Sequence, residues 1–162
     1  MSSDAGVWTV ANRMGRKCRM EPKTTNELMK ILNAMEGLPE LEAYAQTTVK
    51  ETLDTTFPEY IGHRMEEAGM LLSQLICDAQ IQRNYGYQIL NGTKKPGRDK
   101  VIALCMALKL PLSEVQRALT IAQAGVLYPK HRRDSIVIFC INNGMSVLET
   151  NDLLDQLGEA IL

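Results

Sequence analysis

The sequence predicts an all-helical protein, on the evidence of its composition, its hydrophobic spacing and the residues that end its amphipathic segments. Of the 162 residues, 45% are hydrophobic but only 5% are aromatic. The apolar residues are therefore mainly Leu, Ile, Met, Val and Ala, a mixture that favours helices over strands. Apolar residues recur every three or four positions along most of the chain, whereas no segment sustains the alternation of a half-buried strand.

The N-terminal third predicts an arm followed by a pair of helices. Residues 1–23 show no clean periodicity and are interpreted as a flexible arm. Residues 24–57 predict two helices, one that ends at Gly37 and one over about residues 40–54. Because residues 24–71 carry nine acidic side chains and only three lysines or arginines, we expect an acidic helical pair.

Five helices are predicted between residues 58 and 124. Each has apolar residues at helical spacing, and glycine, asparagine or proline stands near most of its ends. They are expected at about residues 59–68, 72–79, 83–90, 98–108 and 112–124. Residues 125–162 then predict a C-terminal hairpin of two helices, the second of which begins with a capping box formed by Ser146 and Glu149.

An internal repeat relates residues 98–127 to residues 133–162 by a shift of 35 positions. The identical pairs are Arg98 and Arg133, Asp99 and Asp134, Cys105 and Cys140, Glu114 and Glu149, Leu119 and Leu154, and Leu127 and Leu162. This pattern favours one helical hairpin used twice over chance similarity between two amphipathic hairpins. Either interpretation predicts a helix over residues 134–142, although the β-branched residues there would also suit a strand.

Residues 73–92 have the pattern of a helix-turn-helix. Such a motif needs an apolar first helix, a short turn closed by a buried aliphatic residue, and a second helix with one apolar and one polar face. Its apolar positions are Leu75, Ile76, Ala79, Ile81, Ile89 and Leu90. Its polar face is predicted to present Gln82, Arg83, Asn84, Tyr85, Tyr87, Gln88 and Asn91. Asn, Gln and Arg can pair with base edges in a major groove, and Tyr can reach phosphates.

A basic loop follows the predicted second helix of this motif. Residues 80–100 carry five basic side chains and one acidic one, although the formal net charge of the whole chain is −1. Lys94, Lys95 and Arg98 are therefore predicted to contact the DNA backbone, since local charge steers a protein to phosphate. The alternative is a solvated surface cluster, and the same two interpretations apply to a second basic cluster at residues 130–133.

Residues 60–119 resemble the Cro/C1-type (XRE-type) helix-turn-helix family. The resemblance rests on residues 89–92, 94–98, 101–110 and 112–115. It implies a lambda-repressor-like five-helix bundle, here flanked by the N-terminal pair and the C-terminal hairpin. The chain from residue 24 onward also resembles bacterial proteins that embed this domain in extra helices. The family implies a sequence-specific transcriptional regulator that reads the major groove with the helix around residues 82–91.

The sequence departs from the family pattern at three places. Leu71 and Leu72 precede Ser73 where a polar cap is usual, and Gln80 replaces the turn glycine. Gly86 lies inside the recognition helix, where glycine costs about 1 kcal/mol relative to alanine. This glycine either allows a close approach of the backbone to a partner or loosens the helix.

No catalytic, cofactor or metal site is predicted. The two histidines, His63 and His131, lack the partners of a catalytic site, and no nucleophile-elbow, zinc-protease or P-loop motif occurs. The four cysteines form no CxxC pair and fit no zinc spacing, so reduced thiols in a cytoplasmic protein are expected. No apolar run approaches the length of about 20 residues needed to span a bilayer.

The expected partner is double-stranded DNA, bound by a homodimer that forms through the N- or C-terminal helices. The alternative function is a helical protein–protein interaction module that keeps the fold without binding DNA. The acidic N-terminal helices and the apolar residues near the C-terminus, such as Leu153, Leu157 and Ile161, would then form its interface.

Overall fold

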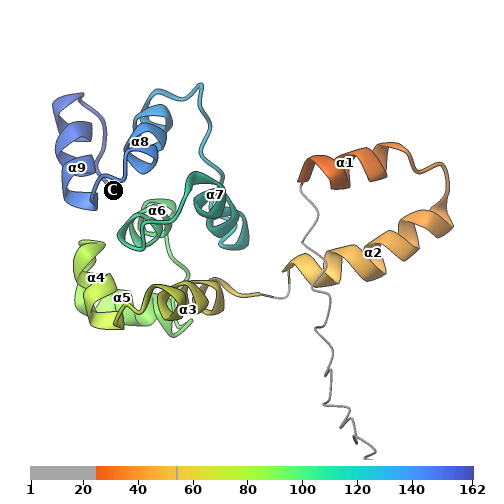
Figure 1. The fold of residues 1–162 in the computed structure, drawn as a ribbon, viewed down its shortest axis with the longest axis horizontal. Coiled ribbons are helices and arrows are strands. Elements are labelled where there is room, and N and C mark those ends of the chain that lie inside the picture. The colour runs from red at the N-terminus through yellow and green to blue at the C-terminus, as the bar shows by residue number, and fades with distance from the viewer. Residues whose placement is uncertain (1–24, 54) are drawn as a thin grey trace, which may run out of the picture. The chain divides into compact units, whose positions relative to one another are not determined.

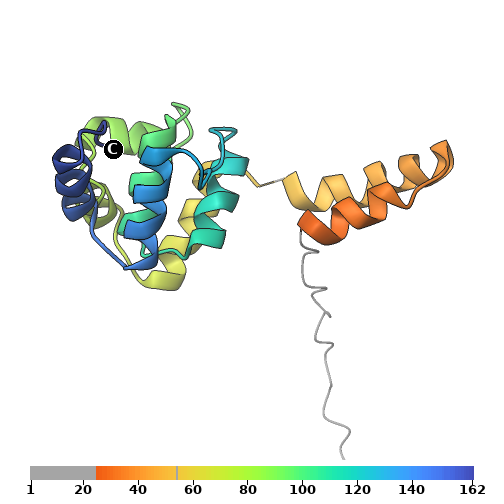
Figure 2. The ribbon, with the colours of Figure 1, turned by 90° about the horizontal axis from the view of Figure 1, so that it is seen from above.

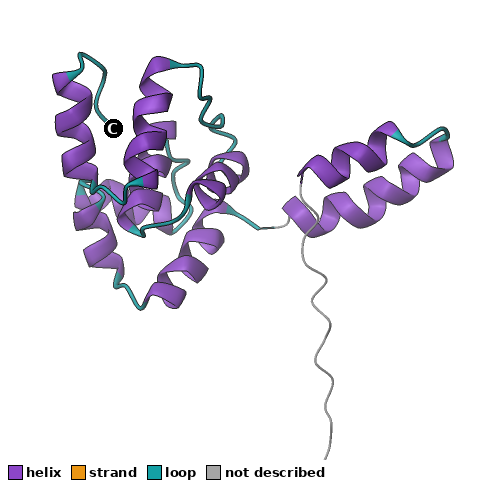
Figure 3. Cartoon of the chain, turned by 45° about the horizontal axis from the view of Figure 1, so that its top comes forward, coloured by secondary structure: helices purple, strands orange, loops and turns teal. Residues whose placement is uncertain are grey.

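The computed structural model describes residues 25–53 and 55–162, and every regular element in these residues is a helix (Figures 1 and 3). The helices are α1 (Thr25–Asn33), α2 (Leu38–Leu53), α3 (Phe57–Ala68), α4 (Leu72–Asp78), α5 (Arg83–Leu90), α6 (Arg98–Ala107), α7 (Leu112–Ile121), α8 (Arg132–Asn142) and α9 (Val147–Gln156). The prediction of an all-α fold is confirmed for these residues. It holds even for α8, where the β-branched side chains would also suit a strand. The arm predicted at residues 1–23 lies outside the described residues.

The chain divides into two compact units, Met1–Thr48 and Val49–Leu162. The first contains α1 and most of α2. Pro39 lies in the first turn of α2, where proline is tolerated because its missing N–H would have no helical partner there. Among the side chains described from residue 26 to residue 46, none is buried, and Leu28, Ile31 and Tyr44 are half-buried.

The second unit has its core around α6. Figure 2 shows the helices of this unit from a second direction. Every residue from 101 to 108 is buried, which explains why this helix shows apolar side chains on all its faces. Helix α6 packs against α4, α7 and α9, and α3 packs against α5 and α7. The segments predicted as a middle domain and as a C-terminal hairpin therefore share one compact unit.

Helix α3 begins at Phe57, two residues before the expected start at Glu59. The Thr56 N–H donates to the Glu59 Oε2 at 2.8 Å, and Pro58 fits the first turn. Phe57 and Pro58 therefore belong to the first turn of the helix. The capping box predicted for the last helix is confirmed, since the Ser146 N–H donates to Glu149 Oε2 at 2.7 Å and Ser146 Oγ accepts from the Glu149 N–H.

Hairpins α6–α7 and α8–α9 make equivalent contacts 35 residues apart, as expected of one hairpin used twice. Gln116 Oε1 accepts from the Leu127 N–H at 2.7 Å, and Asn151 Oδ1 accepts from the Leu162 N–H at 2.8 Å. The two arginines at the starts of α6 and α8 also behave alike. Arg98 donates to the carbonyls of residues 125 and 126, and Arg133 donates to those of residues 160 and 161.

The two hairpins also exchange ion pairs. Arg98 donates to both carboxylate oxygens of Asp134, at 3.0 and 2.7 Å, while Arg133 donates to Asp99 at 2.8 Å. Each arginine therefore binds the aspartate of the other repeat, which is the reciprocal pattern of a two-fold interface. The helix contacts are reciprocal in the same way: the first helix of one hairpin packs on the second helix of the other, α6 on α9 and α8 on α7.

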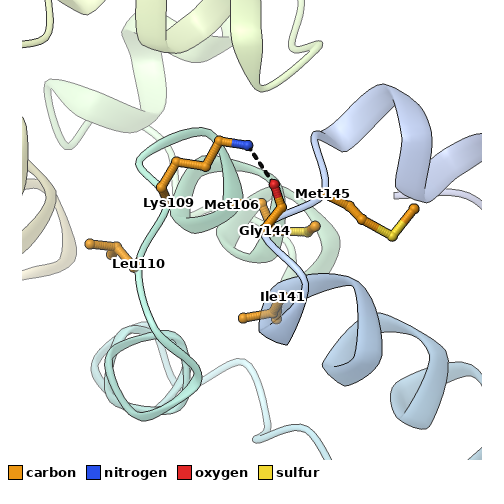
Figure 4. A pocket seen from close by; sticks show the side chains of 6 residues that line it. All are labelled: Met106, Lys109, Leu110, Ile141, Gly144 and Met145. Atoms are coloured by element: carbon orange, nitrogen blue, oxygen red, sulfur yellow. Dashed lines mark hydrogen bonds between the residues drawn. The ribbon is translucent and has the colours of Figure 1, made fainter.

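The equivalent turns after α6 and α8 meet at a cavity of about 30 Å³, shown in Figure 4. It is lined by three repeat-related pairs: Met106 and Ile141, Lys109 and Gly144, and Leu110 and Met145. Lys109 and Gly144 both have the left-handed backbone that such a turn needs. Lys109 Nζ donates to the Gly144 carbonyl at 2.9 Å. The space is about the size of one water molecule, so it cannot hold an organic ligand.

The buried carboxylate of Asp134 predicts a pH dependence of stability. Burial raises its pKa, but hydrogen bonds from Arg98 and from the Tyr128 N–H outweigh burial and hold the pKa below its ordinary value. Such a group stabilises the fold above the unfolded-state pKa of about 4 and loses that contribution as the pH falls through the lower, folded-state pKa. We expect wild type to exceed Asp134→Asn in free energy of unfolding at pH 6, and the gap to shrink below about pH 4. Urea titrations at several pH values measure this difference, and a gap that stays constant down to pH 2 would contradict it.

Candidate nucleic-acid interface

Helices α4 and α5 are joined by a tight turn at residues 79–82. Gln80 has a φ of 53°, a left-handed conformation that glycine would adopt more easily. The Ile81 N–H donates to the Ile76 carbonyl at 3.2 Å, and the Ile81 side chain is buried in the core. The turn is therefore anchored by the aliphatic residue that the sequence predicted, with glutamine in the left-handed position.

Gly86 faces inward, toward α4. A Cβ atom built on this residue would lie 2.7 Å from Cγ1 and 2.8 Å from Cγ2 of Ile76. These distances are shorter than van der Waals contact, so only glycine lets the two helices approach this closely. The structure thus gives Gly86 a role that the sequence did not suggest, which is close packing of α4 and α5 inside the protein, with Gly86 and Ile89 on the buried face of α5.

The polar residues predicted for the recognition helix are all accessible. Gln82, Arg83, Asn84 and Asn91 are exposed, and Tyr85, Tyr87 and Gln88 are half-exposed. Since Gly86 and Ile89 mark the inner side, the helical period of 3.6 residues directs Asn84 and Gln88 to the outer side. The structure thus brings these side chains to one free surface of the second unit.

Two tyrosines position cations at the flanks of α5. The Arg83 guanidinium lies 5.9 Å from the centre of the Tyr87 ring, and Lys94 Nζ lies 5.6 Å from that of Tyr85. Both geometries fit cation–π contacts, which are worth about 0.5–1 kcal/mol at exposed sites. The two half-exposed tyrosines therefore help to fix the positions of Arg83 and Lys94.

The loop between α5 and α6 presents Lys94 and Lys95 to solvent and anchors itself through the buried Pro96. Lys95 Nζ lies 3.4 Å from Gln123 Oε1. An open groove of about 370 Å³ runs beside this loop, between the start of α3 and the end of α7. Its lining includes Pro58, both lysines and Gln123.

Two residues predicted for this surface make side-chain contacts within the protein. Arg98 is held by Asp134 and by two backbone carbonyls, so its guanidinium joins the repeats. Asn91 Oδ1 accepts from the Thr93 N–H at 2.9 Å, which shapes the loop. We therefore assign Arg98 to the fold and leave it out of the interface. The second basic cluster is similar, since Arg132 pairs with Glu159 at 2.8 Å and Arg133 with Asp99.

A cluster of polar residues between α3 and α7 was not found by sequence reasoning. The Tyr60 hydroxyl and the Arg64 guanidinium both donate to the Glu114 carboxylate. The guanidinium carbons of Arg64 and Arg117 lie 5.4 and 5.7 Å from the centre of the Tyr60 ring. Burial, followed by the hydrogen bond to Glu114, raises the pKa of Tyr60 well above its ordinary value. These contacts join α3 to α7, and α3 also packs against α5.

The cysteines described by the structure are free thiols. Cys105 and Cys140 are buried, and burial raises the pKa of Cys105 to about 12. Cys77 is exposed on α4. Within the described ranges, no group of three or more His, Cys, Asp or Glu side chains is placed to hold a metal ion.

No family model, curated protein or solved structure matches the chain. Among the described helices, none has the length and apolar character needed to cross a membrane.

Proposed function

We propose that α3 to α7 form a Cro/C1-type helix-turn-helix domain and that the protein is a sequence-specific DNA-binding transcriptional regulator. The observation that carries this proposal is the free polar face of α5, which lies beside two exposed lysines on the next loop. A helix entering a major groove needs such a face for base edges and nearby cations for phosphates.

The parts of this surface suit different contacts. Asn84 and Gln88 can reach base edges from the outer side of α5, and the exposed Gln82 can do so from the position just before the helix. Lys94 and Lys95 can bind phosphates on either side of the groove, and Arg83 is held over Tyr87 at the start of the helix. The overall charge of −1 is compatible with this function because the positive charge is local.

A dimer would place two copies of α5 on neighbouring half-sites, as helix-turn-helix proteins commonly do. Two observations support association. The α1–α2 hairpin buries no side chain among those described, and the C-terminal hairpin exposes Phe139 and Leu148 by 56% and 58%. The same exposed apolar side chains favour the alternative function, a protein-interaction module that does not bind DNA.

Selection of random duplexes on the full chain at low salt tests this function. We expect a consensus duplex to emerge and its affinity to fall about tenfold in Arg83→Ala and several-fold in Lys95→Ala, because each loses a cationic contact. Lys30→Ala is the matched control, since it removes the same charge from α1, and it should bind as wild type does when its oligomeric state by sedimentation matches that of the wild type. Failure of every duplex to bind at low salt would favour the protein-interaction module instead.

A further inference from the structure

The outer face of α5 is centred on uncharged amide side chains. Asn84 and Gln88 lie four residues apart, one above the other on the same side of the helix. Neither side chain has a hydrogen-bond partner within residues 55–162 of the structure, so both amide groups can bind another molecule. These two residues form what we call the amide pair.

The polar neighbours of the amide pair already contact other groups of the protein. Asn91 uses its carbonyl oxygen to hold the Thr93 N–H, and Arg83 and Lys94 rest on tyrosine rings at the flanks. Cationic side chains therefore stand at the edges of the face and amides stand at its centre.

The chemistry of an amide selects one base in the major groove. An amide offers one acceptor and one donor in a plane, and adenine offers the matching N6 donor and N7 acceptor. Guanine offers two acceptors, O6 and N7, which suit arginine or lysine. The central pair should accordingly favour adenine over guanine.

We infer that Asn84 and Gln88 each read one adenine in the half-site. This inference rests on the proposed function. Four helical residues advance about 6 Å, and one base-pair step of B-DNA advances about 3.4 Å. Two A·T pairs about two steps apart thus form the centre of the predicted half-site.

The test uses the full chain and a duplex selected from a random pool. Each adenine is replaced in turn by 7-deazaadenine, which keeps the Watson–Crick pair and the N6 amino group but lacks the N7 acceptor. We expect affinity to fall about tenfold at two adenines, within the range for one bidentate contact. Asn84→Ala should remove the sensitivity at one adenine and Gln88→Ala that at the other. Asn142→Ala, which deletes an exposed amide from α8, should keep both sensitivities.

The outcomes separate the two proposals. No loss of affinity at any adenine, or 7-deazaadenine losses that persist unchanged in both α5 variants, would overturn the amide pair as the adenine reader while leaving DNA binding intact. Failure of the wild-type chain to retain any duplex at low salt would overturn the proposed function itself, and this inference with it.

Discussion

Replacing Arg98 with alanine should lower the free energy of unfolding by about 3 kcal/mol, near the lower end of the cost of breaking a buried ion pair. The reason is the carboxylate that remains, since Asp134 is only 4% exposed and would keep one hydrogen bond, from the Tyr128 N–H. Urea denaturation followed by circular dichroism at neutral pH measures the change as a shift of the midpoint at constant slope.

The repeat supplies a matched control for this substitution. Arg133 also donates to two backbone carbonyls and one aspartate, but its partner Asp99 has a side chain that is 42% exposed. Arg133→Ala therefore leaves a carboxylate that water can solvate, and we expect it to cost about 1 kcal/mol. Equal losses from the two variants would contradict the role assigned to the burial of Asp134.

Substituting Gly86 with alanine should destabilise the protein by about 2 kcal/mol, although alanine is the better helix former by about 1 kcal/mol. The added methyl group would overlap the Ile76 side chain, whose Cγ1 and Cγ2 atoms lie within 2.8 Å of it. Ile76 is buried and branched at Cβ, so it cannot easily turn aside. The midpoint of thermal or urea unfolding measures the effect.

Gly62 provides the control for this prediction. It also lies within a helix, α3, but a Cβ atom there would meet nothing within 4 Å. Gly62→Ala should therefore raise the free energy of unfolding by up to about 1 kcal/mol. If Gly86→Ala stabilised the protein to the same extent, the close crossing of α4 and α5 would be refuted.

The helices could be predicted from the sequence because their signals are local. Apolar spacing located them, and Gly69, Gly92 and Gly144 mark three of the left-handed turns between them. The start of α3 was expected two residues too late. Proline is disfavoured inside a helix, but it is compatible with the first turn, where Pro58 lies.

The roles of Gly86, Arg98 and Tyr60 depend on contacts between different helices. Gly86 faces Ile76 only because two helices cross there, and Tyr60 meets Glu114 across 54 residues. For Arg98, a signal was present, because the pair Arg98-Asp99 recurs as Arg133-Asp134. Repeated opposite charges at the starts of two packed helices indicate ion pairs between the repeats. An arginine in such a pair is not available to bind DNA, so Arg98 could have been excluded from the predicted interface.

DNA binding is tested most directly by titrating the full chain with its selected duplex over a range of salt concentrations. If Arg83, Lys94 and Lys95 each neutralise one phosphate per protomer, the logarithm of the affinity should fall against the logarithm of salt with a slope of about −3 for each protomer bound. Lys95→Ala should reduce this slope by about 1. A slope near zero, or no binding even at the lowest salt concentration, would contradict the assignment of α5 and its basic loop to DNA.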